Sequence, residues 1–225
     1  MNIQNETMGG TLKQVGFWAA IIIGITAVVA GMIWLVSIQN KPVSNENVTI
    51  ENAITADDWV KGNRAAKVTL IEYGDYQCPA CAAYSSLVNR LADEFGDNLA
   101  VVFRHFPLPQ HKNAVPMIYA AEAAGRQGKF WEMSDMIYAN RSVWEFQSDT
   151  QETVTGYAKA LGLNVTQFQK DLVSADLKKK ADDQIEKNLN LDAIKFTPTF
   201  FLNGKRITPK SYEEFSALVT KAINE

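Results

Sequence analysis

The sequence predicts an α/β domain that carries an inserted set of helices and follows one N-terminal transmembrane helix. Two short runs of apolar, β-branched and aromatic residues, at 67–73 and 99–106, are typical of buried strands. Strand signals disappear between about 112 and 191, where apolar residues recur at helical spacing. Residues 15–36 contain no charge and are long enough to cross a bilayer.

Composition sets the size and class of the protein. A chain of 225 residues allows one domain of ordinary size with additions, and 47% hydrophobic residues can fill a sizeable core. The formal net charge is −3, and no cluster of basic residues forms a patch. Nucleic-acid binding is therefore not expected.

The apolar stretch at 15–36 is predicted to be an uncleaved membrane anchor. A secretory signal is the alternative, but its apolar core is usually about 7–15 residues and ends at small residues. This stretch is longer and ends in Trp34-Leu35-Val36. Residues 1–14 are then an N-terminal tail, and the polar segment 37–54 is a flexible tether.

The charges beside the anchor do not decide its orientation. Lys13 and Glu6 precede it, and Lys41 follows it ahead of Glu46 and Glu51, so the positive-inside rule favours neither side. The cysteines are more informative, because both belong to one short motif and none is left for a structural disulfide. Such usage suits an oxidising space, so we expect the domain on the extracytoplasmic side of the cell membrane.

Both cysteines lie in Cys78-Pro79-Ala80-Cys81, where the strand 67–73 gives way to a helix. Pro79 suits the first helical position, because its missing N–H has no partner there in any helix. The free N–H groups and the dipole at a helix start favour a thiolate, so we expect a lowered pKa for Cys78. Cys81 follows three residues later, close enough to close a disulfide with Cys78.

The sequence also predicts the elements on either side of these strands. Residues 53–63 are predicted to form a first strand or a capping segment. Capping patterns at Ser148-to-Gln151 or Asp149-to-Glu152, and at Thr166-to-Gln169, predict two helix starts within the helical region. Asn203-Gly204 predicts a hairpin between strands 199–202 and 205–208. A last helix is predicted to begin at Ser211, with Glu214 reaching back to its start.

The run from Ile71 to Cys81, joined to the run from Phe196 to Gly204, resembles the thioredoxin superfamily and specifically the DsbA-like disulfide oxidoreductases. A Cys-X-X-Cys motif paired with a later Thr-Pro and an Asn-Gly hairpin is a strong signal. The resemblance covers roughly residues 55–225 and implies a thioredoxin fold with an inserted helical domain at about 112–191. Membrane-anchored bacterial members of this family share the layout.

The resemblance also implies roles for five residues. Cys78 matches the exposed nucleophile and Cys81 its buried partner. Pro198 matches a cis-proline that lies opposite the disulfide and presents backbone to an extended substrate. Thr197 matches the position that tunes substrate handling. Glu72 matches a buried carboxylate that takes or relays the proton of Cys81, and burial should raise its pKa.

Other interpretations of these residues stay open at the level of sequence. Pro198 could be a trans proline that begins an edge strand, and Glu72 could point outward. His105 and His111, together with the two cysteines, match a four-ligand zinc count. The histidines lie on a different element from the cysteines, however, so neither a metal nor a cofactor is expected.

The predicted function is a membrane-tethered thiol–disulfide oxidoreductase that donates the Cys78–Cys81 disulfide to reduced or misoxidised extracytoplasmic proteins through a mixed disulfide. Its reoxidation calls for a quinone-linked DsbB-like or vitamin K epoxide reductase-like membrane protein. DsbA has histidine at the position of Ala80, which leaves the direction of electron flow open. A disulfide reductase or isomerase is therefore one alternative, and a membrane-tethered copper chaperone is another, since two thiolates suit Cu(I).

Overall fold

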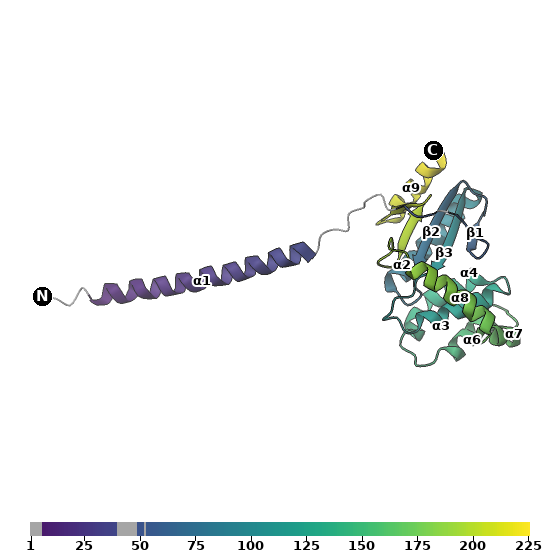
Figure 1. Cartoon of the computed structure of the whole chain (residues 1–225), viewed down its shortest axis with the longest axis horizontal. Helices are drawn as coiled ribbons and strands as arrows, with labels where there is room; N and C mark the ends of the chain where they lie inside the picture. Colours follow the sequence, from purple (N-terminus) through teal and green to yellow (C-terminus); the bar gives the residue numbers. More distant parts are fainter. Residues whose placement is uncertain (1–5, 40–48, 52) are drawn as a thin grey trace. The chain divides into compact units, whose positions relative to one another are not determined.

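The computed structural model describes residues 6–39, 49–51 and 53–225, which form two compact units, Met1–Glu46 and Asn47–Glu225. In the first unit, helix α1 (Glu6–Gln39) extends beyond both ends of the predicted 15–36 anchor (Figure 1). Its stretch Phe17–Trp34 has a mean hydropathy of 2.2 and exposed side chains. By length and composition, this stretch could span a membrane.

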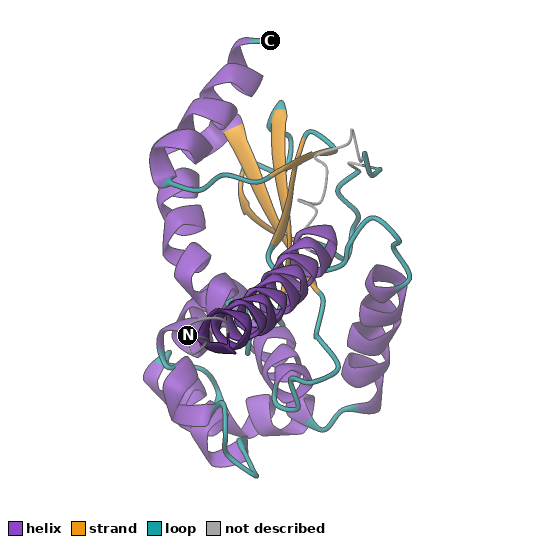
Figure 2. Cartoon of the chain, turned by 90° about the vertical axis from the view of Figure 1, so that its left-hand side faces the viewer, coloured by secondary structure: helices purple, strands orange, loops and turns teal. Residues whose placement is uncertain are grey.

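The second unit is built on a mixed sheet of five strands, coloured orange in Figure 2. The strands are β1 (Trp59–Gly62), β2 (Val68–Gly74), β3 (Leu99–His105), β4 (Thr199–Leu202) and β5 (Lys205–Ile207). Their order is β1-β3-β2-β4-β5, with β2 and β3 parallel and every other pair antiparallel. The predicted strands and hairpin are confirmed, and the segment 53–63 supplies an edge strand.

The predicted tether at 37–54 lies partly outside the described residues, which omit 40–48 and 52. Helix α1 includes its first residues, up to Gln39. Near its other end, Thr49 forms a β-bridge with Lys205, and the N–H of Ile50 donates to the carbonyl of Gly204 at 2.9 Å. Residues 49 and 50 therefore pair with the edge of β5.

Central strand β2 is buried along its whole length, and its side chains alternate between the two faces of the sheet. Val68 and Leu70 pack in one core with α2 (Pro79–Phe95) and α9 (Tyr212–Asn224). Ile71 and Tyr73 pack in another core on the opposite face. Glu72 follows the alternation of Leu70, so its carboxyl lies on the α2 face and does not point outward to solvent.

A set of helices is inserted between β3 and β4. They are α3 (Ala114–Gly125), α4 (Phe130–Ala139), α5 (Arg141–Trp144), α6 (Gln151–Ala160), α7 (Val165–Leu172) and α8 (Ala175–Leu189), while a short 3-10 turn (Gly96–Asn98) precedes β3. Figure 1 shows α3, α4, α6, α7 and α8 at one end of the sheet, away from the C-terminal end of α9. Cys81 shares a buried core with Met117, Ile137 and Trp144 of this insertion. The motif therefore lies where the sheet layer meets the insertion.

The predicted cap of α7 is wrong. Helix α7 begins at Val165, one residue before the predicted cap Thr166, and is capped by Asn164, which accepts from the N–H of Gln167 at 3.0 Å. Asparagine caps a helix at least as well as threonine, so Asn164 takes this role and the helix begins earlier than predicted. Helix α6 begins at Gln151, and Asp149, one of its two predicted cap residues, accepts from the N–H of Gln151 at 2.9 Å. Thr150, directly before the helix, makes no side-chain capping bond.

The last helix begins as predicted. Ser211 accepts from the N–H of Glu214 at 3.3 Å, which is the expected cap. The carboxylate of Glu214 reaches back to the N–H of Lys210, at 2.7 Å.

Gly125 provides a test of the packing between the insertion and the sheet. A Cβ at Gly125 would lie 2.4 Å from the ring of Trp59. That ring is held by stacking on Phe130, with centroids 4.8 Å apart, and by a 2.7 Å bond to Glu122. Gly125→Ala should therefore lower the free energy of unfolding by about 1–3 kcal/mol.

Gly156 in α6 is the matched control for Gly125, because a Cβ there meets no atom within 4 Å. Gly156→Ala should raise the free energy of unfolding by about 0.5–1 kcal/mol, since alanine loses less backbone entropy than glycine in a helix. Urea unfolding monitored by circular dichroism measures both variants. Equal stabilities would contradict the packing described for Trp59.

Candidate active site

The site is built at the start of α2, where Cys78 occupies the N-cap position with extended backbone angles, φ −71° and ψ 122°. Pro79 follows at the start of the helix, as predicted. Both thiols are free. Cys81 is fully buried, and Cys78 is 6% exposed, so the prediction of an exposed Cys78 is wrong. The loop that carries Thr197 covers it, since the Cys78 sulfur lies 3.4 Å from the carbonyl oxygen of Thr197.

The two thiols differ in acidity. A hydrogen bond from Cys81, together with the Thr197 side chain and the N–H groups of Cys81 and Ala80, lowers the pKa of Cys78 to about 5 against the opposing effect of burial. Burial raises the pKa of Cys81 well above its ordinary value, as does its hydrogen bond to Cys78. Cys78 is therefore the thiolate of the pair and Cys81 the thiol, in line with the predicted lowering at a helix start.

Glu72 lies beneath the motif and is 3% exposed. Burial, and then the negative charge of Cys78, raise the pKa of Glu72 to about 8, in the predicted direction. Within the part of the chain that the structure describes, its Oε1 atom has no hydrogen-bond partner. A Cβ at Gly74 would come within 3.1 Å of that oxygen and 2.4 Å of the Phe103 ring, so only glycine leaves this space open.

Thr197 and Pro198 lie on the loop before β4. The peptide bond between them is cis, so the interpretation of Pro198 as a trans proline is wrong. Beside this loop is a cavity of about 290 Å³. It is lined by apolar and polar side chains from α2, the loop and the hairpin: Tyr84, Phe196, Thr197, Pro198, Thr199, Phe200, Arg206, Ile207, Thr208, Pro209 and Lys210. One of these residues is Thr197, whose carbonyl oxygen lies 3.4 Å from the Cys78 sulfur.

Each histidine pairs with a carboxylate instead of a cysteine. His105 Nε2 lies 3.0 Å from Glu122, and His111 Nδ1 lies 2.6 Å from Asp75. Among residues 49–51 and 53–225 of this unit, no three His, Cys, Asp or Glu side chains are grouped so that they could hold a metal ion.

Asp75 is a residue near the cysteines that the sequence does not single out, because Gly74-Asp75 by itself indicates only the end of a strand. Its side chain is fully buried and accepts three hydrogen bonds. The donors are the N–H of Gln77 at 2.7 Å, the N–H of Leu108 at 2.7 Å and His111. The bond to Gln77 is an Asx-turn, which an aspartate directly after a strand could have indicated.

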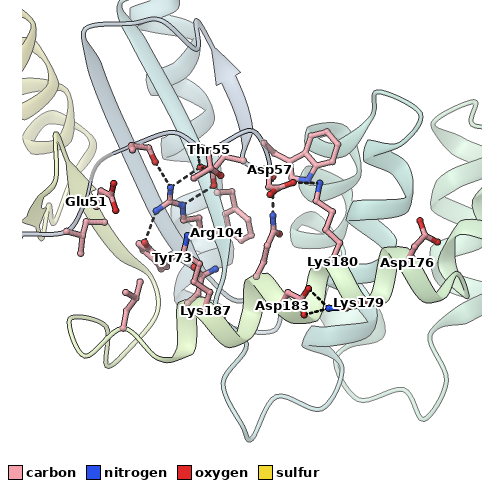
Figure 3. A pocket seen from close by; sticks show the side chains of 18 residues that line it. Glu51, Thr55, Asp57, Tyr73, Arg104, Asp176, Lys179, Lys180, Asp183 and Lys187 are labelled. Atoms are coloured by element: carbon pink, nitrogen blue, oxygen red, sulfur yellow. Dashed lines mark hydrogen bonds and ion pairs between the residues drawn. The ribbon is translucent and has the colours of Figure 1, made fainter.

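A larger cavity of about 670 Å³ lies on the face of the sheet that carries Tyr73 and Arg104, beside α8 (Figure 3). Arg104 donates to Asp58 and to the carbonyl of Ala53, each at 2.9 Å, and so holds the segment that precedes β1. Two further ion pairs lie along the cavity, Lys180–Asp57 at 2.9 Å and Lys179–Asp183 at 2.7 Å. Neither cysteine lines this cavity. The Lys180–Asp57 pair connects α8 to the segment before β1, whereas Lys179–Asp183 lies within α8.

A family model described as Thioredoxin matches residues 55–221. The chain belongs to the thioredoxin family. Its fold is that of DsbA-type members, as solved structures show. Wolbachia pipientis alpha-DsbA1 has a TM-score of 0.67 at 18% identity, over 76% of this chain and 93% of that one. BdbD from Bacillus subtilis has a TM-score of 0.66 at 24% identity, over 80% of this chain and 99% of that one. MdbA from Corynebacterium diphtheriae, a thiol-disulfide oxidoreductase, has a TM-score of 0.58 at 19% identity, over 81% of this chain and 99% of that one.

Curated relatives of the thioredoxin domain include much longer proteins. A protein named Na(+)/H(+) antiporter NhaA 1 from Mycolicibacterium gilvum is 38% identical over 152 residues, which are 66% of this chain and 24% of that one. One of the same name from Salinispora arenicola is 36% identical over 168 residues, 74% of this chain and 25% of that one. This chain spans about a quarter of their length. The antiporter name belongs to those longer proteins and is not carried over to this chain.

The acidity of Cys78 can be measured by alkylation. In the reduced protein the rate of reaction with iodoacetamide should rise with pH and reach half its maximum near pH 5, where an ordinary thiol would do so near 9.0. Mass spectrometry should place the label on Cys78 and leave Cys81, which is buried and protonated, unmodified. Cys78→Ser is the control and should abolish the alkylation that occurs with a midpoint near pH 5. A midpoint near 9.0 would contradict a thiolate stabilised by the helix start.

Glu72 should make the stability of the reduced protein depend on pH. Its pKa is about 8 when folded and 4.5 ordinarily, so the folded state holds an extra proton between these values. Glu72 then costs no stability below pH 4.5, and its cost grows as pH rises and is complete above pH 8. The free energy of unfolding of Glu72→Gln should therefore rise relative to that of the native protein as the pH increases from 4.5 to 8, by roughly 3–5 kcal/mol in total. Urea unfolding at several pH values tests this, and a difference independent of pH would contradict it.

Proposed function

We propose that this protein is a membrane-tethered thiol–disulfide oxidoreductase that donates the Cys78–Cys81 disulfide to extracytoplasmic proteins. The observation that carries the proposal is the division of acidity at the start of α2, with a thiolate at Cys78 and a buried thiol at Cys81. A stable Cys78 thiolate favours the reduced form of the pair, and a protein whose reduced form is stabilised is a strong oxidant. The shared fold of DsbA-type oxidoreductases supports the same reaction.

The exchange begins with the oxidised protein. A substrate thiolate attacks the sulfur of Cys78, the Cys78–Cys81 bond breaks, and a mixed disulfide forms between substrate and Cys78. The electron pair of the broken bond goes to Cys81, which takes a proton from Glu72, because a carboxyl with a pKa of about 8 still holds one near neutral pH. A second substrate thiolate then attacks the substrate sulfur. The substrate leaves with a disulfide, and Cys78 leaves as a thiolate.

The cis-proline loop is proposed to bind the substrate chain. Its cavity of about 290 Å³ is lined by Pro198, Phe200 and the exposed Phe196, among other residues. An extended chain lying beside Pro198 would bring its own thiolate to the Cys78 sulfur, which is in contact with the Thr197 carbonyl. We expect reduced or misoxidised, unfolded proteins as substrates, because a folded protein could not present an extended segment to this loop.

The location and the reoxidising partner belong to the same proposal. The stretch Phe17–Trp34 is proposed to anchor the chain in the cell membrane, with the thioredoxin domain on the extracytoplasmic side, where disulfides persist. Each turnover leaves two reduced thiols, so a thiol oxidase must remove two electrons. A quinone-linked membrane protein of the DsbB or vitamin K epoxide reductase kind would meet the tethered domain at the same membrane.

The direct test is oxidation of a reduced, unfolded protein by the full chain in detergent. Cys78→Ser should abolish oxidation, since the attacked sulfur is gone. Cys81→Ser should trap the mixed disulfide if a substrate disulfide is offered to its free Cys78, because no resolving thiol remains. Gly156→Ala, far from the cysteines in sequence and on exposed helix surface, is the control and should retain full activity. An unchanged rate in Cys78→Ser would overturn the proposal.

A further inference from the structure

Asp75 contacts both cysteines through its backbone. Its N–H donates to the Cys81 sulfur, with 3.5 Å between the two atoms, and its carbonyl accepts from the N–H of Cys78 at 3.1 Å. The first contact occupies the Cys81 sulfur as an acceptor from one side. The S–H of Cys81 is then left to donate to Cys78, which is the hydrogen bond that lowers the pKa of Cys78 most.

The side chain of Asp75 fixes that backbone in place. Oδ1 accepts from the N–H of Gln77, which closes the turn before Cys78. Oδ2 accepts from Leu108 and from His111 Nδ1, which lie on the loop between β3 and α3. Because the carboxylate is fully buried and bonded on both oxygens, it cannot turn without breaking at least one of these bonds.

We propose that Asp75, held by His111, is a positioning residue that sets the redox properties of the Cys78–Cys81 pair. It does so by fixing the turn whose N–H orients the Cys81 sulfur toward Cys78. Asp75 itself need not touch the substrate. The inference deepens the function proposed above and rests on it for its biological meaning, but the geometry concerns the two thiols alone.

His111 is the one of the three hydrogen-bond donors to Asp75 that a substitution can remove, because the other two are backbone N–H groups. Its ring is partly exposed, with 18% of the side chain accessible, whereas the carboxylate it holds is not. Its own backbone N–H donates to the carbonyl of Leu108 at 2.9 Å, which makes the loop a compact turn around Oδ2. Removing the imidazole should therefore loosen the Asp75 side chain without removing the other two donors.

The first variant is Asp75→Asn. An amide has one acceptor oxygen, and its NH₂ group must then face either Gln77 or the pair Leu108 and His111, so at least one donor loses its partner. The matched control is Asp58→Asn. It also removes a buried carboxylate, here the partner of Arg104, but on the face of the sheet opposite Glu72. Both variants should lose stability, and only Asp75→Asn should change the thiols.

Three quantities are measured on the full chain in detergent: the pKa of Cys78 from thiolate absorbance at about 240 nm, the equilibrium with glutathione, and the urea midpoint. Asp75→Asn should raise the pKa of Cys78 by about one unit, a tenfold loss of thiolate stability. The reduced form should be disfavoured about tenfold in the glutathione equilibrium, which lowers the potential by about 30 mV. Asp58→Asn should leave both values unchanged.

A second pair of variants covers the case in which Asp75→Asn does not fold. His111→Ala should raise the pKa of Cys78 in the same direction but by less, and His111→Gln, which keeps an N–H donor, should restore most of the native value. An unchanged Cys78 pKa in both Asp75→Asn and His111→Ala, or equal shifts in Asp58→Asn, would overturn the proposal. These measurements need no protein substrate, so they stand even if the oxidase assay fails.

Discussion

The structure depends on a helix start whose N-cap residue is a cysteine. The first N–H groups of any helix lack partners within the helix, and in α2 those of Ala80 and Cys81 face the sulfur of Cys78. A Ser or Asp at that position would satisfy them with oxygen and make an inert cap. Because the acceptor here is sulfur, the same N–H groups stabilise the thiolate of Cys78 over the thiol. Pro79 adds no N–H to compete, and the end of β2 fixes where the helix begins.

Burial then separates the two thiols. Cys78 and Cys81 share one helical turn, yet one faces the helix start and the other belongs to the core of the insertion. The same low-polarity environment that keeps Cys81 protonated also keeps a proton on Glu72. In the reduced protein Cys81 and Glu72 therefore both hold protons, while Cys78 does not. The insertion matters here because its core supplies the burial.

Much of this arrangement follows from local sequence. A strand running into Cys-Pro-Ala-Cys fixes the helix start, and Asn203-Gly204 fixes the hairpin that follows Pro198, because each signal lies within a few residues. The contact of Asp75 with His111 joins residues 36 positions apart and depends on where the loop after β3 returns. The burial of Cys78 likewise depends on Thr197, 119 positions away. The predicted cap of α7 is wrong for another reason, since asparagine and threonine are both residue types that cap helices and Asn164 lies only two positions before Thr166.

The Arg104 contacts have a mechanical consequence. The segment before β1 is fastened to β3 by an ion pair with Asp58 and a bond to the carbonyl of Ala53. These bonds lie on the face of the sheet opposite Glu72. Tension on the segment before β1 would load Arg104 and the paired strands before it reached the turn at Asp75. The geometry of the cysteines is thereby insulated from forces on the chain that precedes β1.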